Sequence, residues 1–188
     1  MNSITVNCPA KINLTLEIVN KREDGFHNIK SIMQTISLYD TLIIKVGEGD
    51  GEILLSGNSS EIPYNEKNLV YRAAELFYRE TGINNVRTEI YIDKNIPISA
   101  GLAGGSSDAA GTIFGLNKLL GHPLKTMHKL CETLGSDLNV CLEGGSILAT
   151  SRGEVIKKLK PVKSKLTLIK PKNLGISARE AYTKYSNK

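Results

Sequence analysis

A glycine-rich segment carries the strongest chemical signal in the sequence. It consists of Pro97, Ile98, Ser99, Ala100, Gly101, Leu102, Ala103, Gly104, Gly105, Ser106 and Ser107. Glycines let the backbone approach a ligand closely, and the unpaired N–H groups and positive dipole end at the start of a helix suit phosphate. The segment matches neither G-x-x-x-x-G-K-[ST] nor G-x-G-x-x-G. It is therefore either a phosphate loop of another kind or a tight turn packed against a sheet.

Two polar residues near the N-terminus are further candidates. Polar and apolar residues alternate over residues 11–18, which predicts a half-buried strand. Lys11 and Asn13 would lie about 7 Å apart on one face of that strand. Four apolar residues would face the core: Ile12, Leu14, Leu16 and Ile18. The Lys11 and Asn13 pair is either a functional cation and amide or an ordinary solvated strand face.

An aspartate and an aromatic turn complete the set of candidates. Asp137 lies in an expected loop just after a helix, where it could act as a base or serve as a turn or capping residue. Phe26 and His27 follow Asp24-Gly25, a strong turn signal. The ring of Phe26 is either a ligand contact or a core anchor, and the His27 imidazole is either a ligand contact or a surface group.

The elements that must position these residues alternate between strands and helices. Hydrophobic periodicity predicts helices over residues 68–81, 109–120 and 125–134, with Ser106 or Ser107 as the N-cap of the second. It predicts further strands over residues 4–6, 41–46, 53–55, 88–92, 139–142, 146–149 and 166–169. This pattern indicates an α+β fold, with helices packed on a mixed sheet.

Composition excludes several classes of protein. The 188 residues are 40% hydrophobic with no Trp, and they contain neither an apolar run of membrane-spanning length nor a signal peptide. Three cysteines without a C-x-x-C pair, and two histidines six positions apart, predict neither a disulfide framework nor a zinc site. We therefore expect a globular cytoplasmic protein that does not associate with membranes.

The net charge of +5 is unevenly distributed along the chain. Residues 1–150 carry 13 Lys and Arg against 17 Asp and Glu, whereas residues 151–188 carry 11 against 2. The basic character therefore belongs to the C-terminal stretch. That stretch contains no recognisable nucleic-acid-binding motif, so we expect no nucleic-acid partner.

Four segments taken together, in this order, resemble the GHMP kinase superfamily. They are P-A-K-I-N-L at residues 9–14, R-E-D-G-F-H at 22–27, the glycine-rich segment running into D-A-A at 108–110, and L-G-S-D at 134–137. The first two narrow the resemblance to the branch that phosphorylates the 2-hydroxyl of 4-diphosphocytidyl-2-C-methyl-D-erythritol in the non-mevalonate route to isoprenoids. The similarity runs from about Asn7 to Tyr182.

The resemblance implies roles for the catalytic residues. The segment from Pro97 to Ser107 would bind ATP through its backbone amides. Asp137 would accept the proton of the substrate hydroxyl, and Lys11 would stabilise the carboxylate and offset negative charge in the transition state. ATP chemistry implies Mg²⁺, and Ser107 is the loop hydroxyl expected nearest to that ion.

The resemblance also implies how the substrate is held. Asn13 would form a hydrogen bond with the methylerythritol part of a small cytidine-diphosphate substrate. Phe26 and Tyr182 would enclose the cytosine ring between them, and His27 would form a hydrogen bond with the base.

The implied architecture has two domains. Residues 1–160 would form the GHMP kinase N-terminal domain, of the ribosomal protein S5 domain 2-like fold, and residues 161–188 would begin a ferredoxin-like second domain. Because the family continues for about another hundred residues, we expect a truncated form, for which a separate C-terminal segment or a homo-oligomer is a candidate partner. The alternatives are a catalytically silent nucleotide-binding remnant and another small-molecule kinase of the superfamily.

Overall fold

The computed structural model describes residues 1–122, 124–171, 175, 181 and 185. Its strands are β1 (Asn2–Lys21), β2 (His27–Glu48), β3 (Ile53–Gly57), β4 (Val86–Asp93), β5 (Ser146–Ser151) and β6 (Val155–Leu159). Its helices are α1 (Leu69–Thr81), α2 (Gly104–Leu120), α3 (Leu124–Leu134) and α4 (Leu138–Glu143). The α+β class predicted from the sequence is confirmed.

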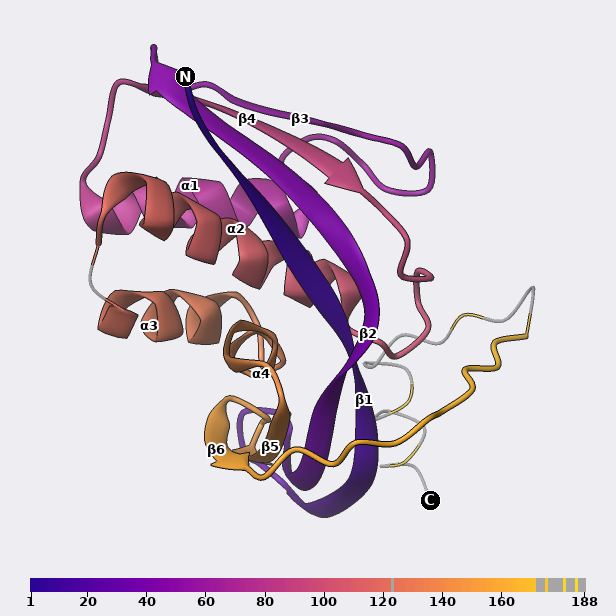
Figure 1. Cartoon of the computed structure of the whole chain (residues 1–188). Coiled ribbons are helices and arrows are strands. Elements are labelled where there is room, and N and C mark those ends of the chain that lie inside the picture. The colour runs from indigo at the N-terminus through magenta and orange to yellow at the C-terminus, as the bar shows by residue number, and fades with distance from the viewer. Residues whose placement is uncertain (123, 172–174, 176–180, 182–184, 186–188) are drawn as a thin grey trace.

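The six strands form one mixed sheet built around a long ribbon of β1 and β2 (Figure 1). These two strands pair antiparallel, from Asn2 opposite Val46 to Lys21 opposite His27. On its other side, β2 pairs with β5 in its first half and with β4 in its second half. β6 pairs antiparallel with β5, whereas β3 joins β4 in parallel. The sheet is thus divided into an upper part with β3 and β4 and a lower part with β5 and β6.

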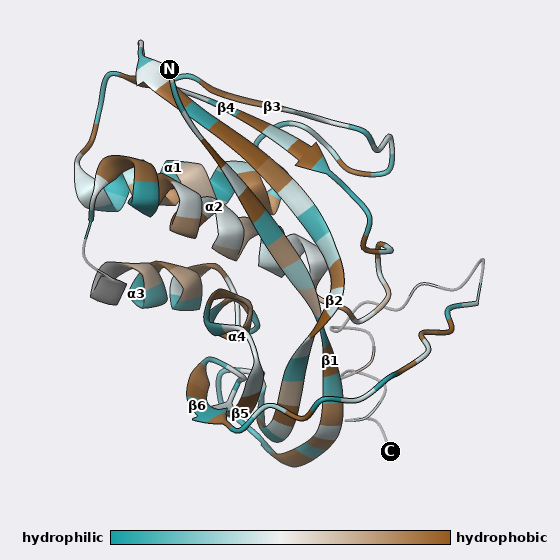
Figure 2. Cartoon of the chain, in the orientation of Figure 1, coloured by the Kyte–Doolittle hydropathy of each residue, from teal (hydrophilic) through white to brown (hydrophobic). Residues whose placement is uncertain are grey.

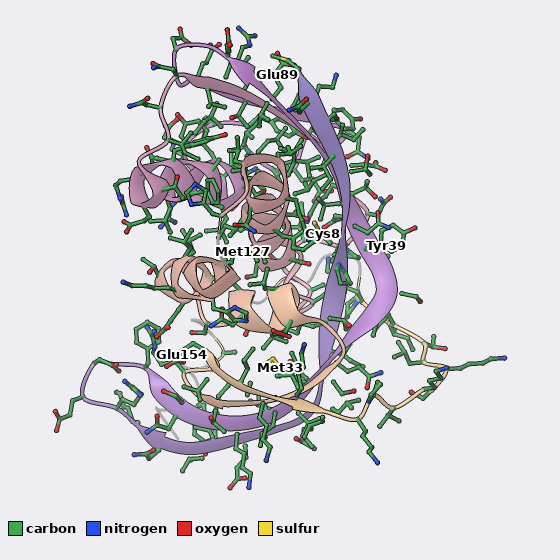
Figure 3. All side chains as sticks on the ribbon, turned by 60° about the vertical axis from the view of Figure 1, so that its left-hand side comes forward. Cys8, Met33, Tyr39, Glu89, Met127 and Glu154 are labelled. Carbon is green, nitrogen blue, oxygen red and sulfur yellow. The ribbon has the colours of Figure 1, made fainter. Side chains whose placement is uncertain are left out.

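The main core lies between the upper sheet and helices α1 to α3. Side chains from both layers fill this space, where Cys8 and Met127 are buried, while Tyr39 is 44% exposed (Figure 3). Apolar and polar bands alternate along the long strands (Figure 2), as expected for a sheet with one covered face. The three cysteines, Cys8, Cys131 and Cys141, are free and buried.

Helix α1 begins and ends where the sequence predicts. The Asn68 side chain accepts a hydrogen bond from the backbone N–H of Val70 at 2.9 Å, and Gly82 adopts φ 68° at the C-cap. These residues satisfy the end groups that a helix leaves unpaired. Among the described residues, no helix combines the length and apolar character needed to cross a membrane.

Helix α2 packs closely against the sheet because Gly111 has no side chain. A Cβ atom added at Gly111 would lie 2.3 Å from Sγ of Cys8. Gly105, in the same helix, has no atom within 4 Å of an added Cβ. We therefore expect Gly111→Ala to lower the free energy of unfolding by about 1–3 kcal/mol through overpacking. Urea titration followed by circular dichroism checks this, with Gly105→Ala as the control; equal stability of the two variants would contradict it.

Three expectations about secondary structure are wrong. Residues 139–142 belong to α4, because periodicity alone does not distinguish a short apolar run in a strand from one in a buried helix. Residues 166–169 lie in a segment without regular structure. Helix α2 begins at Gly104 after Ala103, so Ser106 and Ser107 lie in its first turn instead of capping it.

The expected inward face of the first strand is also wrong in its second half. Leu14 and Leu16 are 46% and 51% exposed, whereas Lys11 is 6% exposed. The pairing of β1 with β2 shifts register between Pro9 and Lys11 and again between Asn13 and Thr15. Such irregularities re-aim side chains, and helix α2 packs on the other half of the ribbon (Figure 1).

Candidate active site

Lys11 is the buried cation of the candidate site. It lies at the register shift in β1, where its backbone N–H donates to the carbonyl of Leu102 at 3.0 Å. Its Nζ donates to Oδ1 of Asn13 at 2.9 Å and lies 3.4 Å from Oδ2 of Asp137. The strand therefore connects the glycine-rich segment to two further candidate residues through a single lysine.

Asn13 is held in one orientation by a residue that the motif analysis missed. Its Nδ2 donates to Oγ of Ser31 at 2.8 Å, and the Ser31 hydroxyl donates to the carbonyl of Thr15 at 2.6 Å. Ser31 is fully buried on β2, where it pairs with Leu16 in the register, while Asn13 pairs with Met33. These two hydrogen bonds direct Oδ1 of Asn13 toward Lys11. No motif in the sequence points to Ser31, because the strand pairing that brings it there is long-range.

The carboxylate of Asp137 makes no capping hydrogen bond with the neighbouring backbone. Asp137 occupies the N-cap position of α4, and 32% of its side chain is exposed. Val140 of α4 anchors the helix in a small apolar cluster with Met33 and Ile147 (Figure 3). The carboxylate is thus held at the surface beside Lys11, where an incoming hydroxyl group can reach it.

The glycine-rich segment has the backbone geometry of an anion site. Ser99, Gly101 and Ala103 have φ values of 55°, 74° and 56°, whereas Ala100 and Leu102 between them have no positive φ. Such an alternation turns successive N–H groups toward one side, which forms a concave anion-binding nest. A Cβ added at Gly101 or Gly105 would meet no atom within 4 Å, so there is open space beside the loop.

Ser107 is buried and makes a structural hydrogen bond. Its hydroxyl donates to the carbonyl of Pro9 at 2.8 Å, and 2% of the residue is exposed. This bond holds the first turn of α2 against β1, close to Lys11. Its expected contact with Mg²⁺ stays a prediction. Among the residues that the structure describes, no three His, Cys, Asp or Glu side chains gather in a group that could hold a metal.

Three buried charges lie beneath the glycine-rich segment. Nζ of Lys94 is 2.5 Å from Oδ2 of Asp40 and 2.7 Å from Oδ2 of Asp108, and each side chain is at most 7% exposed. Asp40 also accepts hydrogen bonds from the backbone N–H groups of Asn95 and Ile96. The cluster therefore joins β2, the segment leading into the loop, and the N-terminal part of α2. Sequence analysis missed Asp40 and Lys94, because they are 54 positions apart.

Asp108 is the titratable member of this cluster near neutral pH. Burial raises the pKa of Asp108 to about 7, against the charge of Lys94 and with the help of the Asp40 carboxylate. Its Oδ1 is buried without a hydrogen-bond partner among the described atoms. Because an unfolded aspartate titrates near pKa 3.9, the folded chain holds an extra proton between about pH 4 and pH 7. This group therefore lowers stability as the pH rises through that window.

Asp108→Asn is expected to remove that loss of stability. The melting temperature of the variant minus that of the parent should be larger at about pH 8 than at about pH 5. The increase should be about 2–4 °C for each kcal/mol of unfolding free energy that the substitution restores. Differential scanning calorimetry at both pH values measures this. Asp50→Asn, in an exposed turn, is the control and should show no such dependence. A pH-independent difference for Asp108→Asn would contradict the assignment.

The aromatic turn is rigidly braced. The Arg22 guanidinium donates to both carboxylate oxygens of Asp24, and Oδ1 of Asp24 accepts from the backbone N–H of Phe26 at 3.1 Å. Phe26 is 51% exposed, so it is not a core anchor, whereas His27 is 9% exposed and is not a surface imidazole. The ring of Tyr185 meets His27 edge-on at 6.4 Å. Tyr182, expected beside the base, lies outside the described residues.

The structure therefore brings some candidates into direct contact and keeps others apart. Lys11 contacts both Asn13 and Asp137, and its backbone joins them to the glycine-rich segment. Phe26 and His27 lie at the far end of the β1 and β2 ribbon. This arrangement suits a ligand with a phosphate at one end of the site, a reacting hydroxyl at the carboxylate and an aromatic base at the turn.

Comparisons with known proteins show what this chain is similar to. The family model described as "GHMP kinases N terminal domain" matches residues 68–146. A 4-diphosphocytidyl-2-C-methyl-D-erythritol kinase from Heliobacterium modesticaldum is 46% identical over 177 residues, which cover 93% of this chain and 56% of that protein. The same-named protein from Clostridium tetani is 45% identical, covering 95% and 64%. This chain thus spans less than two thirds of these relatives.

Solved structures agree with the sequence relatives. A crystal structure of 4-(cytidine 5'-diphospho)-2C-methyl-D-erythritol kinase superposes with a TM-score of 0.69 at 35% identity, covering 83% of this chain and 55% of that one. A crystal structure of mevalonate kinase superposes with a TM-score of 0.64 at 18% identity, covering 84% and 56%. The second likeness shows the fold alone.

Proposed function

Because this chain carries the N-terminal domain of the GHMP kinases, we propose that it transfers the γ-phosphoryl group of ATP to the 2-hydroxyl of 4-diphosphocytidyl-2-C-methyl-D-erythritol. Homology over 93% of the chain to a protein named for that activity supports the substrate. The contact of Lys11 with both Asp137 and the glycine-rich segment carries the proposal.

Phosphoryl transfer depends chiefly on positioning and on stabilising charge. Asp137 accepts the proton of the attacking hydroxyl, which its exposed position permits. Nζ of Lys11, 3.4 Å from that carboxylate, offsets negative charge as the phosphoryl group moves. The hydrogen bond from Lys11 to Leu102 fixes the distance between this pair and the loop.

The loop and the start of α2 hold the phosphates of ATP. The alternating backbone at residues 99–103 supplies N–H donors, and α2 adds the positive end of its dipole. Mg²⁺ bound to a nucleotide takes most ligands from phosphates and water, and it supplies charge neutralisation. Ser107, near the start of α2, is the hydroxyl of this chain that we propose lies nearest to that ion. The described residues form no dedicated carboxylate cage at the site, which fits an ion that arrives with the nucleotide.

The other end of the site holds the substrate. Phe26 offers an exposed aromatic face for the cytosine ring, and His27 lies beside it. Nδ2 of Asn13 is engaged by Ser31, and Oδ1 accepts from Lys11, so Asn13 orients Lys11 as well as facing the methylerythritol hydroxyls. Tyr182 is proposed as the second aromatic residue at the base.

A coupled assay for ADP release tests this function. The chain is incubated with ATP, Mg²⁺ and one of three acceptors: the cytidyl-erythritol compound, mevalonate or homoserine. We expect ADP release above the rate of ATP hydrolysis only with the first acceptor. Turnover of another acceptor alone would reassign the substrate within the superfamily. Binding of ATP and CDP by calorimetry without ADP release would instead identify a silent nucleotide-binding protein.

A further inference from the structure

We infer that Arg152 is a substrate-positioning residue, which fixes the Phe26 ring and leaves one ring face for the nucleobase. The inference rests on the proposed function and deepens its base-binding end. Cζ of Arg152 lies 5.2 Å from the centroid of the Phe26 ring, over its face. The ring nevertheless stays 51% exposed. One face is therefore covered by a guanidinium group, and the open area belongs to the other side of the ring.

The guanidinium is itself held in place by a nearly buried acid. Nε of Arg152 lies 3.7 Å from Oε1 of Glu154, whose side chain is 9% exposed. Arg152 is half-buried, with 28% of its side chain exposed. A cation over an aromatic face is attracted by the ring quadrupole, and partial desolvation strengthens that attraction. The pair with Glu154 thus limits where Arg152 can lie, and Arg152 limits how Phe26 can turn.

The turn that carries Arg152 contacts both ends of the substrate site. At one end, Nη1 of Arg22 donates to Oγ of Ser151 at 3.1 Å, and Arg22 also grips Asp24 of the aromatic turn. At the other end, a Cβ added at Gly153 would lie 3.4 Å from Cβ of Ser136, the neighbour of Asp137. Residues 151–154 therefore lie between the base-binding turn and the segment that presents the carboxylate.

A second contact fixes the same turn to α4. Nδ2 of Asn139 donates to the backbone carbonyl of Glu154 at 3.2 Å. Asn139 follows Asp137 by two positions and is 5% exposed. The turn thus sets the separation between the nucleobase on Phe26 and the hydroxyl at Asp137. An acceptor whose base and hydroxyl are linked by a diphosphate must match this separation, so Arg152 contributes to substrate choice through Phe26.

Arg152→Leu tests the inference, since leucine keeps an apolar stem but removes the planar cation. We expect the KM for the cytidyl-erythritol compound to rise about fivefold to thirtyfold, as loss of a partly desolvated cation–π contact implies. The KM for ATP and kcat should stay within about twofold, and the dissociation constant of CDP should rise in parallel. Arg152→Lys should recover part of the affinity. Arg87→Leu, at a paired arginine on β4, is the control.

A double-mutant cycle separates this role from general stability. If Arg152 acts through the ring, Phe26→Ala with Arg152→Leu should weaken CDP binding no more than Phe26→Ala alone. Additive losses, or a fall in kcat at unchanged KM, would overturn the inference. CDP binding by the parent with equal binding by Arg152→Leu would overturn it as well. Absence of CDP binding by the parent would overturn the proposed base site, and this inference with it.

Discussion

Asp137→Asn is expected to lower kcat by about 10²- to 10⁴-fold, the usual contribution of a positioned general base. The amide keeps the shape of the side chain, and its oxygen can still lie beside Nζ of Lys11, so the change removes the negative charge and the basicity of the side chain. The KM values for ATP and acceptor should change little, because the phosphate loop and the aromatic turn are untouched. Steady-state kinetics of ADP release measures the effect.

Asp50→Asn is the matched control for this variant, because it makes the same chemical change in an exposed turn. It should retain the parental kcat. Parental turnover in Asp137→Asn would sink the proposed mechanism, because the described site offers no other carboxylate beside Lys11. Loss of ATP binding in Asp137→Asn would instead assign the aspartate to nucleotide binding.

Lys11→Met is expected to lower kcat by about 10²- to 10³-fold, as removal of a single preorganised charge-stabilising donor does in other enzymes. Methionine keeps the unbranched stem, which is buried, while the positive charge beside Asp137 is lost. Because the backbone N–H of Lys11 still donates to Leu102, the loop should keep its position. The KM for ATP should therefore change much less than kcat.

Lys45→Met serves as the control, since Lys45 is an exposed lysine on β2. Circular dichroism spectra of both variants should match the parent. A raised KM for ATP at unchanged kcat in Lys11→Met would place the lysine in nucleotide binding and remove it from the phosphoryl-transfer step.

The parts of the site that could be predicted from sequence are those whose signal residues lie next to the backbone feature that they predict. The glycines at 101, 104 and 105 signal a close backbone approach before a helix, and Asn68 and Gly82 mark the ends of α1. Asp24-Gly25 signals the turn that presents Phe26. Each signal lies within a few positions of the structure it predicts, so no tertiary information is needed.

The parts that could not be predicted depend on long-range pairing. The alternation of polar and apolar residues predicted that Lys11 lies on a polar strand face. The register shift beside Pro9 instead places Lys11 in a buried position. The ion cluster of Lys94 with Asp40 and Asp108 forms only when the sheet and α2 pack together. Arg152 reaches Phe26 from 126 positions away along the chain. Periodicity in a single strand or helix contains no information about such partners.

The burial of all three cysteines has a practical consequence for following the protein in solution. Burial raises the pKa of Cys8, Cys131 and Cys141, so at neutral pH these thiols lack both ionisation and access to reagents. A thiol introduced on the surface, as in Lys45→Cys, would thus react selectively with a maleimide fluorophore while the native sulfur atoms stay unmodified. The native cysteines therefore need not be replaced before a single surface position is labelled for spectroscopy.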